Sequence, residues 1–433
     1  MSLTFKGGFH PEGNKDLTSG KPIVKFNTPK EVVIPLSQHI GAPCSPCVKV
    51  GDEVFVGQVL GDNDAFVSVP IHSSVSGTVK AIEKRPHAIQ GECTAVVIEN
   101  DENYTVSPDI KPVDLKSLSK KEKIEHIKRA GIVGMGGATF PTFIKLNVPD
   151  GKKIDTVIIN GAECEPFLTA DHRLMLENGE AVADGLEIVM DILDVKNGLI
   201  VIEDNKQDAI DKMTEVCKKH EGVRTVKVKT KYPQGSEKQI IDAVLKREVK
   251  SGGLPADVGV VVLNAASAAQ ISKYFKTGMP LTERVLTVSG SGVKNPQNLL
   301  VKIGTPFSAI AEFVGLTDGV KKVLSGGPMM GIAQYTLDVP VMKGTSGILF
   351  LTDKEDKEYE EKSCIRCGKC VDHCPMRLMP FMITELSRMN DFDEAVKYGL
   401  KDCIECGTCS YICPQRRYLV QTIRTAKAKL PKK

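Results

Sequence analysis

Residues 364–375 have the sequence CIRCGKCVDHCP, and residues 403–414 repeat the same pattern as CIECGTCSYICP. Each copy has the spacing Cys-x2-Cys-x2-Cys-x3-Cys-Pro, and the two copies hold eight of the 13 cysteines in the chain. In proteins that carry two cubane clusters, three closely spaced thiolates hold one cluster while the fourth, before proline, ligates the other. The repeat therefore predicts two [4Fe–4S] clusters near the C-terminus.

The spacing also predicts which thiolates share a cluster. The first cluster is expected to use Cys364, Cys367, Cys370 and Cys413. The second is expected to use Cys403, Cys406, Cys409 and Cys374. Structural zinc is the alternative, but tetrahedral zinc sites are usually built from two separated pairs of ligands. Two complete copies of a run of four favour iron–sulfur clusters.

The segment between Cys374 and Cys403 is too long for a hairpin, and its patterns at 379–389 and 392–398 are helical. We therefore expect an α-helical ferredoxin domain at residues 355–420, followed by a solvated basic tail at 421–433. A pair of clusters relays electrons one at a time. A two-electron donor would need a converter elsewhere in the chain.

Composition excludes several classes of protein. The 433 residues include 57 basic and 54 acidic side chains, so no basic footprint points to nucleic acid as a partner. No run of about 18 apolar residues occurs, which predicts no membrane-spanning helix. The N-terminus lacks the apolar stretch of a secretory signal, so we expect metal or redox cysteines in a reducing, cytoplasmic compartment. Cys44 and Cys47 have no second pair nearby and are expected to be turn thiols rather than zinc ligands.

The remaining pattern divides the chain into further units. Residues 1–27 form an irregular arm, and residues 28–105 contain short β runs between turns, which predicts a barrel-sandwich. The clearest runs lie at 31–35, 53–60, 65–69, 75–82 and 94–99. Residues 115–282 alternate apolar strands with amphipathic helices, which predicts an α/β sheet covered by helices. Residues 283–345 suggest a separate small module, so the expected fold class is multidomain α+β.

A glycine-rich loop, GIVGMGGATFPT at residues 131–142, begins the α/β region. Gly134, Gly136 and Gly137 would expose backbone amides and let a phosphate or a flat ring approach the chain. The loop follows a helix rather than a strand, so it is not the Rossmann dinucleotide fingerprint. A tight structural loop is the alternative interpretation.

Polar residues follow the predicted strand at 154–159, where NGAECEP occupies residues 160–166. Groups at the carboxyl end of a strand in an open α/β sheet lie where ligands bind. Asn160 could bond the amides of a ring, and Glu163 or Glu165 could accept from a ribose or a carboxamide. A capped turn is the alternative.

These segments resemble the flavin and NADH site of the respiratory complex I flavoprotein subunit. The segments that carry the resemblance are the glycine loop with Phe140 and Lys145, residues 160–166, YPQGSE at 232–237, and Asn264-Ala265. A β-grasp module of the soluble-ligand-binding (SLBB) type near 284–335 belongs to the same resemblance. With FKGGFH at 5–10 and both cysteine motifs in order, the whole chain is similar to the C subunits of Rnf ion-translocating oxidoreductase complexes.

The resemblance to complex I implies a non-covalent FMN in the glycine loop, with NAD(H) as substrate. The residues it places around the flavin are Gly134, Gly136, Gly137, Lys145, Asn160, Glu163, Tyr232, Gly235 and Asn264. The residues it places at the nicotinamide nucleotide are Glu165, Glu237 and a stacking Phe140. The chain departs from the complex I pattern at Met135, Ala162, Ser236 and Ala265.

The resemblance to Rnf subunits implies an NADH-reactive flavin and iron–sulfur oxidoreductase subunit of a membrane translocase complex. It would exchange electrons between NAD(H), FMN and two [4Fe–4S] clusters on a ferredoxin:NAD+ pathway. Its expected partners are the other subunits, with ferredoxin reached indirectly, and its expected location is peripheral, on the cytoplasmic side of the cell membrane. Two alternatives are a subunit of a soluble NADH-linked dehydrogenase or hydrogenase, and a non-catalytic iron–sulfur relay scaffold.

Overall fold

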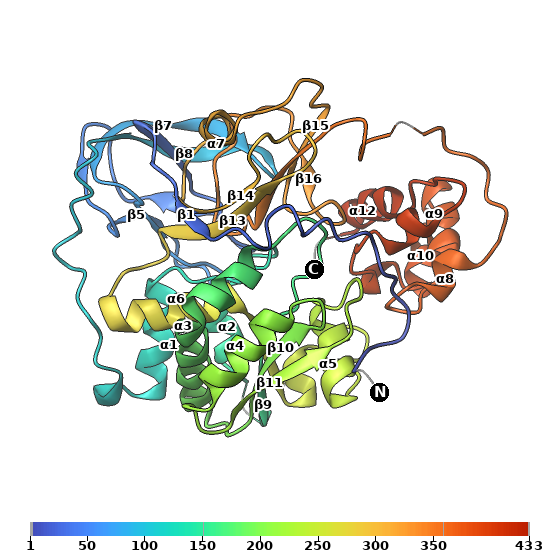
Figure 1. Ribbon diagram of the computed structural model, residues 1–433, viewed down its shortest axis with the longest axis horizontal. Helices are drawn as coiled ribbons and strands as arrows, with labels where there is room; N and C mark the ends of the chain where they lie inside the picture. Colours follow the sequence, from blue (N-terminus) through green and yellow to red (C-terminus); the bar gives the residue numbers. More distant parts are fainter. Residues whose placement is uncertain (1–2, 150, 358, 432–433) are drawn as a thin grey trace.

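Four units and an N-terminal arm make up the chain in its computed structural model, which describes residues 3–149, 151–357 and 359–431 (Figure 1). Leu3 of the arm forms a bridge with Val228 at the edge of the central sheet. Near the end of the arm, β1 (Ile23–Lys25) pairs in parallel with β14 (Gln297–Lys302) of the third unit. The arm predicted at residues 1–27 is therefore tied to units that lie far apart in the sequence.

The first unit consists of two small antiparallel sheets around an apolar core that includes Val32 and Ile34. The larger sheet contains β2 (Glu31–Pro35), β8 (Gly91–Asn100), β7 (Gly77–His87) and β4 (Glu53–Val54). The smaller contains β3 (Ser45–Pro46), β5 (Val59–Asp62) and β6 (Ile71–His72). The predicted barrel-sandwich unit is confirmed.

Two of the expected strands in this unit were wrong. The run at 53–60 is divided into β4 and β5 because Gly57 has φ +86°, a left-handed conformation that turns the chain. The run at 65–69 forms a loop, where Val67 O accepts a hydrogen bond from Ala42 N. A Cβ on the neighbouring Gly41 would lie 2.0 Å from that same oxygen, so the two loops approach too closely for a regular strand.

The second unit is the α/β domain, whose four strands are parallel in the order β11-β10-β9-β12. The strands are β9 (Thr156–Gly161), β10 (Gly198–Glu203), β11 (Val223–Val228) and β12 (Val260–Asn264). The helices are α1 (Lys120–Arg129), α2 (Thr142–Leu146), α3 (Ala170–Leu193), α4 (Gln207–Cys217), α5 (Glu237–Leu245) and α6 (Ala265–Thr277). Short 3-10 turns lie at Leu115–Ser117 and Pro255–Val258.

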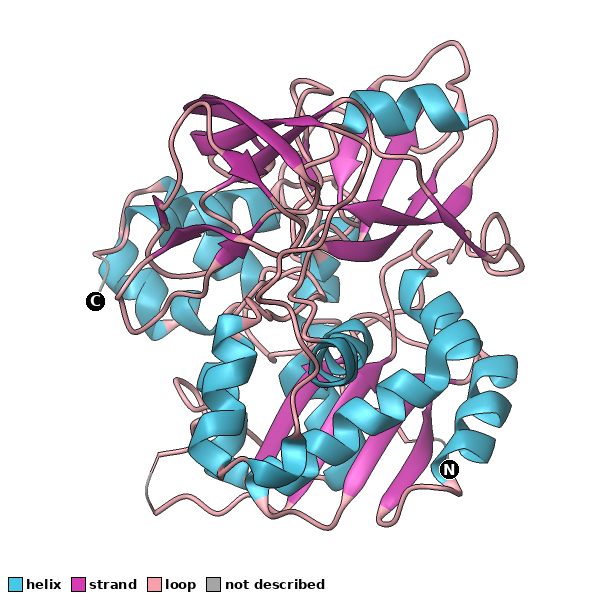
Figure 2. Ribbon diagram, turned by 90° about the vertical axis from the view of Figure 1, so that its left-hand side faces the viewer, coloured by secondary structure: helices cyan, strands magenta, loops and turns pink. Residues whose placement is uncertain are grey.

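Side chains of this sheet alternate between two apolar cores, as strands buried on both faces require. Val157 and Ile159 pack with α3, α4 and α6, whereas Ile158 packs with α5 on the opposite face. Helix α1 begins with a capping box, because Ser119 accepts from Glu122 N while the Glu122 carboxylate accepts from Ser119 N. The predicted α/β architecture is confirmed, and its carboxyl edge faces the rest of the molecule (Figure 2).

The third unit is a mixed sheet with one covering helix. Its strand order is β1, β14, β13 (Glu283–Ser289), β17 (Gly347–Leu351), β15 (Lys322–Ser325) and β16 (Ile332–Ala333). Helix α7 (Phe307–Val314) supplies Phe307 and Ile310 to its core. The module expected at 283–345 therefore ends too early, because β17 lies between β13 and β15 in the sheet.

The fourth unit is helical, as the sequence predicts. It contains α8 (Lys369–Asp372), α9 (Pro380–Arg388), α10 (Phe392–Lys397), a 3-10 turn at Leu400–Asp402, α11 (Thr408–Ile412) and α12 (Leu419–Lys429). The solvated tail expected at 421–433 was wrong, because α12 packs Ile423 and Ala426 into the core against α9. Lys432 and Lys433 lie outside the described residues. Among the helices that the structure describes, none is both long and apolar enough to cross a bilayer.

Candidate functional site

The parallel sheet has a switch point between β9 and β12. The chain proceeds from β9 to β10 and β11 on one side, and then places β12 on the other side of β9. Asn160 near the end of β9 and Asn264 at the end of β12 are direct partners in the pairing register. Ligands of open α/β sheets bind outside the carboxyl ends of the strands at such a point. The structure thus brings two predicted residues together where a ligand is expected.

Asn160 connects the end of β9 to the segment 232–237. Its Nδ2 donates to Gly235 O at 2.7 Å, and its Oδ1 accepts from Ala162 N at 3.1 Å. Gly235 N in turn donates to Cys164 Sγ at 3.3 Å. A Cβ on Gly235 would lie only 3.3 Å from that sulfur, so glycine suits this close approach. Predicted residues from two separate motifs therefore meet here.

Asn264 faces the glycine-rich loop. Its Oδ1 accepts from Ala266 N at 2.9 Å as the N-cap of α6, and its Nδ2 donates to Asp171 Oδ2 at 2.6 Å. A Cβ on Gly136 would lie 3.5 Å from Asn264 Nδ2, and one on Gly137 would meet nothing within 4 Å. Gly137 also has φ +114°, which few side chains tolerate. The loop therefore exposes its backbone beside the switch point, as predicted.

Buried groups hold the glycine loop from beneath. Ser267 Oγ accepts from Met135 N at 2.9 Å and donates to Val133 O at 2.8 Å. Arg284, only 2% exposed, donates to Met135 O at 3.3 Å. These bonds engage the inward backbone groups while residues 136–138 stay exposed. A preorganised loop of this kind can bind a phosphate or a ring edge without rearrangement.

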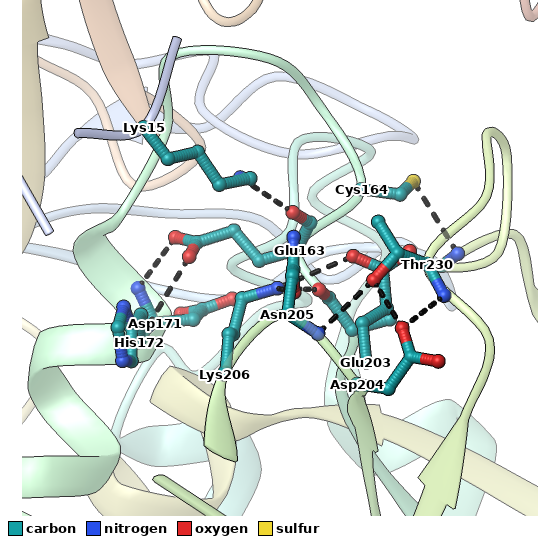
Figure 3. A network of polar contacts seen from close by, with 12 residues as sticks. Lys15, Glu163, Cys164, Asp171, His172, Glu203, Asp204, Asn205, Lys206 and Thr230 are labelled. Carbon is teal, nitrogen blue, oxygen red and sulfur yellow. Dashed lines mark hydrogen bonds and ion pairs between the residues drawn. The ribbon is translucent and has the colours of Figure 1, made fainter. Parts of the chain in front are cut away.

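The turn after β9 is fixed by a helix N-terminus and a buried lysine (Figure 3). The Glu163 carboxylate accepts from Asp171 N at 2.7 Å and from His172 N at 3.2 Å, in the first turn of α3. Lys206, 1% exposed, donates to Ala162 O at 2.7 Å. Both carboxylate oxygens of Glu163 are thus engaged by α3, so this predicted residue fixes the turn.

Two carboxyl groups of the site have raised pKa values. Glu165 Oε2 accepts from Met329 N at 3.0 Å, and its Oε1 accepts from Met330 N at 2.9 Å. Burial raises the pKa of Glu165 to about 7 despite these two bonds. Burial first, and the Glu163 carboxylate second, raise the pKa of Asp171 to about 7 as well. Both carboxyl groups can therefore gain or lose a proton near neutral pH.

Lys145 and Glu237 form an ion pair, with Lys145 Nζ 2.6 Å from Glu237 Oε1. Lys145 also donates to Val262 O at 3.0 Å on the strand next to β9. Phe140, at the end of the glycine loop, is half-buried, and Thr142 Oγ1 is buried without a partner among the described residues. The Lys145–Glu237 ion pair and the Thr142 hydroxyl are therefore polar groups near the loop that could bind a polar ligand.

A buried amide in segment 232–237 also lacks a partner. Neither Oε1 nor Nε2 of Gln234 has a hydrogen-bond partner within the described part of the chain, and the side chain is 0% exposed. Buried side-chain amides are nearly always paired. Gln234 lies between Tyr232 and Gly235, two residues predicted to surround the flavin. The unpaired amide and the exposed glycine loop together fit a flat, polar cofactor such as FMN.

Tyr232 joins the α/β unit to the second cysteine motif. Its hydroxyl donates to Cys406 O at 2.8 Å, and its side chain is 1% exposed. Phe9 of the arm packs against Tyr232 at a centroid distance of 5.7 Å and stacks on Tyr411 at 4.5 Å. The second motif is therefore seated on the segment that carries Gly235.

Each predicted set of cysteines lines a cavity of its own. One cavity is lined by Cys374, Cys403, Cys406 and Cys409. The other is lined by Cys364, Cys367, Cys370 and Cys413. This grouping is the one that exchange of the fourth ligand between the two motifs would give.

The buried thiols need a compensating charge in order to ionise. Burial raises the pKa of Cys403 to about 11. Burial, with the neighbouring thiols Cys403, Cys406 and Cys374, raises the pKa of Cys409 further. Bound iron supplies positive charge and takes thiolates as ligands, so it removes this penalty. The set of donors around each cavity therefore fits an iron–sulfur cluster.

We expect Tyr232→Phe to weaken the binding of the second cluster, on Cys403, Cys406, Cys409 and Cys374. The change leaves the ring packed but removes the donor to Cys406 O, and an unsatisfied buried carbonyl costs about 1–2 kcal/mol. Iron release to a chelator under anaerobic conditions should become roughly tenfold faster for half of the iron. Tyr418→Phe is the control. The Tyr418 side chain is exposed, and its hydroxyl makes only a long hydrogen bond, 3.5 Å to Tyr359 O, so little should be lost with it. Equal rates in the two variants would contradict the expectation.

Sequence reasoning missed several residues that build the site. Lys206 follows β10 by three positions, and the rule that located Asn160 at a strand end would have found it. Asp171 lies in the first turn of α3 and contacts Asn264 from there. Lys15 of the arm contacts the turn after β9, which lies about 150 positions later in the sequence, and no local sequence pattern predicts that contact.

Family comparisons match four successive parts of the chain. Residues 3–103 match the RnfC barrel sandwich hybrid domain, and residues 127–273 match the Nuo51 FMN-binding domain. Residues 285–333 match the SLBB domain, and residues 356–414 match the 4Fe-4S dicluster domain. These matches confirm the expected order of units and the cofactors FMN and [4Fe–4S].

Relatives align over nearly the whole chain. The C subunit of the Na(+)-translocating ferredoxin:NAD(+) oxidoreductase complex of Acetobacterium woodii is 50% identical over 429 residues, 99% of this chain and 97% of that one. The C subunit of the proton-translocating complex of Clostridium ljungdahlii is 50% identical over 433 residues, 99% and 94% of the two chains. A solved NAD+-reducing [NiFe]-hydrogenase covers 72% of this chain and 60% of its own at 13% identity, with a TM-score of 0.49 that supports no argument.

Proposed function

Because the chain belongs to the family of C subunits of ion-translocating ferredoxin:NAD(+) oxidoreductase complexes, we propose that it is the subunit through which such a complex exchanges electrons with NAD(H). When bound, FMN supplies the conversion between the electron pair of the nicotinamide and single electrons for the clusters. The residues of this chain bind and orient the cofactors and connect their sites.

The switch point is the place where the flavin would be held. The residues that would hold it are Gly134, Gly136, Gly137, Lys145, Asn160, Glu163, Tyr232, Gly235 and Asn264. Support comes from the exposed loop at 136–138, the paired asparagines and the unpartnered amide of Gln234. The nicotinamide nucleotide would be met by Phe140, Glu165 and Glu237.

The hydrogen bond of 2.8 Å between the Tyr232 hydroxyl and Cys406 O is the observation that carries the proposal. Through it the proposed flavin site and the cavity of the second cysteine set share one buried side chain. The second cluster, on Cys403, Cys406, Cys409 and Cys374, would therefore be the one nearer to the flavin. The first, on Cys364, Cys367, Cys370 and Cys413, would exchange electrons with a partner subunit, since Cys367 is exposed.

Protons at this site would be handled by carboxyl groups of the chain. Glu165 and Asp171 have pKa values raised to about 7, so each can hold a proton on a carboxyl oxygen at neutral pH. Reduction and oxidation of a nicotinamide–flavin pair change the number of bound protons. These two side chains would therefore buffer the site while Asn160 and Asn264 keep the geometry fixed.

The proposed location is the cytoplasmic side of the membrane, in contact with the other subunits. Support comes from the relatives, which are named as subunits of complexes that translocate Na(+) or protons. NAD(H) and ferredoxin are carriers of the cytoplasm, so the nucleotide site must open to that side. Ferredoxin would be reached through the partner subunits.

A variant of the glycine loop tests the flavin proposal. Gly136→Val would fill the space in front of Asn264, where an added Cβ already lies 3.5 Å from the side-chain amide. We expect anaerobically purified Gly136→Val to lose FMN and NADH–ferricyanide activity, by at least roughly tenfold, while keeping its iron. Gly20→Val is the control, because a Cβ there meets nothing within 4 Å.

The wild-type preparation separates the competing functions. Absence of flavin absorbance even after addition of FMN would contradict the proposal and favour a relay scaffold. FMN and activity in a chain that never co-purifies with hydrophobic subunits would favour a soluble dehydrogenase or hydrogenase subunit.

A further inference from the structure

Lys15 of the N-terminal arm contacts the turn that follows β9 (Figure 3). Its ammonium donates to the carbonyl oxygens of Glu163, Glu165 and Leu168 at 2.8, 2.9 and 2.5 Å. An ammonium has three N–H donors, so these three hydrogen bonds use all of them. The arm is thereby bound to three carbonyl groups of the segment that contains Glu165, a residue proposed to contact the nicotinamide nucleotide.

The hydrogen-bond partners of Lys15 are neutral, and its charge is therefore not cancelled by direct contact. The second lysine of the turn, Lys206, differs because it forms an ion pair with Glu203 at 3.2 Å. Burial, and then the charge of Lys206, lower the pKa of Lys15, whereas Glu163 and Glu203 raise it. Lys15 thus lies near Lys206 and the carboxylates of Glu163 and Glu203, but within the described part of the chain it contacts neither carboxylate directly.

Attachment of the arm does not require Lys15. Phe167 N donates to Gly13 O at 2.7 Å, and the hydroxyls of Thr18 and Thr169 lie 2.7 Å apart. These contacts flank Lys15 on the arm and would hold it in place without a charge. A partly buried ammonium without a contacting carboxylate is costly, so its position calls for an explanation other than docking.

We propose that Lys15 is a positioning residue of the flavin site, which fixes the turn 163–168 and whose charge favours the reduced flavin. The inference rests on the proposed function, because it assumes FMN at the switch point beside Asn160. Added electrons make a flavin more negative, and a fixed positive charge nearby lowers the free energy of that form. Lys15 therefore raises the midpoint potential of the flavin.

The test is a redox titration of FMN in the full-length protein with intact clusters. Lys15→Met keeps the length of the side chain and removes the charge, and Lys15 lines a cavity of about 640 Å³ that can admit the thioether. We expect the ratio of reduced to oxidised flavin at a fixed potential to fall about tenfold, which corresponds to about 30 mV for a two-electron couple. Lys21→Met is the control, since Lys21 also donates from the arm to a carbonyl, Pro296 O at 2.8 Å.

An unchanged potential in Lys15→Met would overturn the inference, whereas absence of FMN from the wild type would overturn the proposed function instead. If Lys15→Met is isolated without flavin, the affinity for added FMN replaces the potential. An affinity at least tenfold weaker than in Lys21→Met, with iron content and circular dichroism intact, supports the inference. Loss of iron and of the folded spectrum would show that Lys15 serves folding alone, and would overturn it.

Discussion

Replacing Cys374 with alanine is expected to remove the cluster of the second motif, although Cys374 belongs to the first. Cys374 lines one cavity together with Cys403, Cys406 and Cys409. It is 8% exposed, and its sulfur accepts from Leu378 N at 3.3 Å. Among the described residues, no cysteine of the other set lines this cavity, so none is placed to replace Cys374. The iron content should fall by half.

The same variant should also interrupt electron flow. The lost cluster is the one beside Tyr232, so NADH should no longer reduce the remaining cluster at the wild-type rate. NADH–ferricyanide activity, which needs only the flavin, should be retained. Iron analysis and low-temperature paramagnetic resonance of the NADH-reduced protein measure both effects.

Cys413→Ala is the matched control, because it removes the fourth ligand of the other set. It should lose the same amount of iron, yet its remaining cluster, next to the α/β unit, should still be reduced by NADH. The opposite outcome, with reduction blocked in Cys413→Ala and preserved in Cys374→Ala, would show that each motif supplies all ligands of its own cluster.

The cysteine sets and the glycine loop were predicted from local spacing alone, because each motif consists of residues close together in the sequence. The order of the strands was not predictable in this way. Alternation of strands and helices indicates a parallel sheet, but the position of β12 beside β9 depends on packing of the whole unit. Only that position makes Asn264 a neighbour of Asn160.

Helices α6 and α12 were not predicted, for opposite reasons. Helix α6 consists largely of small residues and is buried on nearly all sides, so it lacks an amphipathic stripe. Helix α12 does have a stripe, formed by Leu419, Val420, Ile423 and Ala426, but its lysines and arginine suggested a solvated tail. Lys427 instead donates to Cys403 O at 2.9 Å beside the second cavity.

Glu165 is expected to make the stability of the protein depend on pH between about 4.5 and 7. Burial raises its pKa from 4.5 to about 7, so the folded state keeps a proton that the unfolded chain releases. Stability from this group is therefore complete below pH 4.5 and is lost as pH rises toward 7. A shift of this size corresponds to a total loss of about 3 kcal/mol.

Glu165→Gln cannot ionise and should not show this loss. The difference in unfolding free energy between Glu165→Gln and the wild type, from urea titrations followed by circular dichroism, should grow by about 2–3 kcal/mol between pH 5 and 8. Glu283→Gln is the control: burial alone would raise the pKa of Glu283, but Lys273 and Lys302 lower it to about 2. Its difference from the wild type should stay constant over this range.

A constant or shrinking difference for Glu165→Gln would mean that the carboxylate is stabilised when ionised. The expected growth would instead mean that the burial of Glu165, which favours the protonated acid, outweighs the hydrogen bonds from Met329 N and Met330 N, which favour the carboxylate. The folded protein would then be most stable when Glu165 carries its proton.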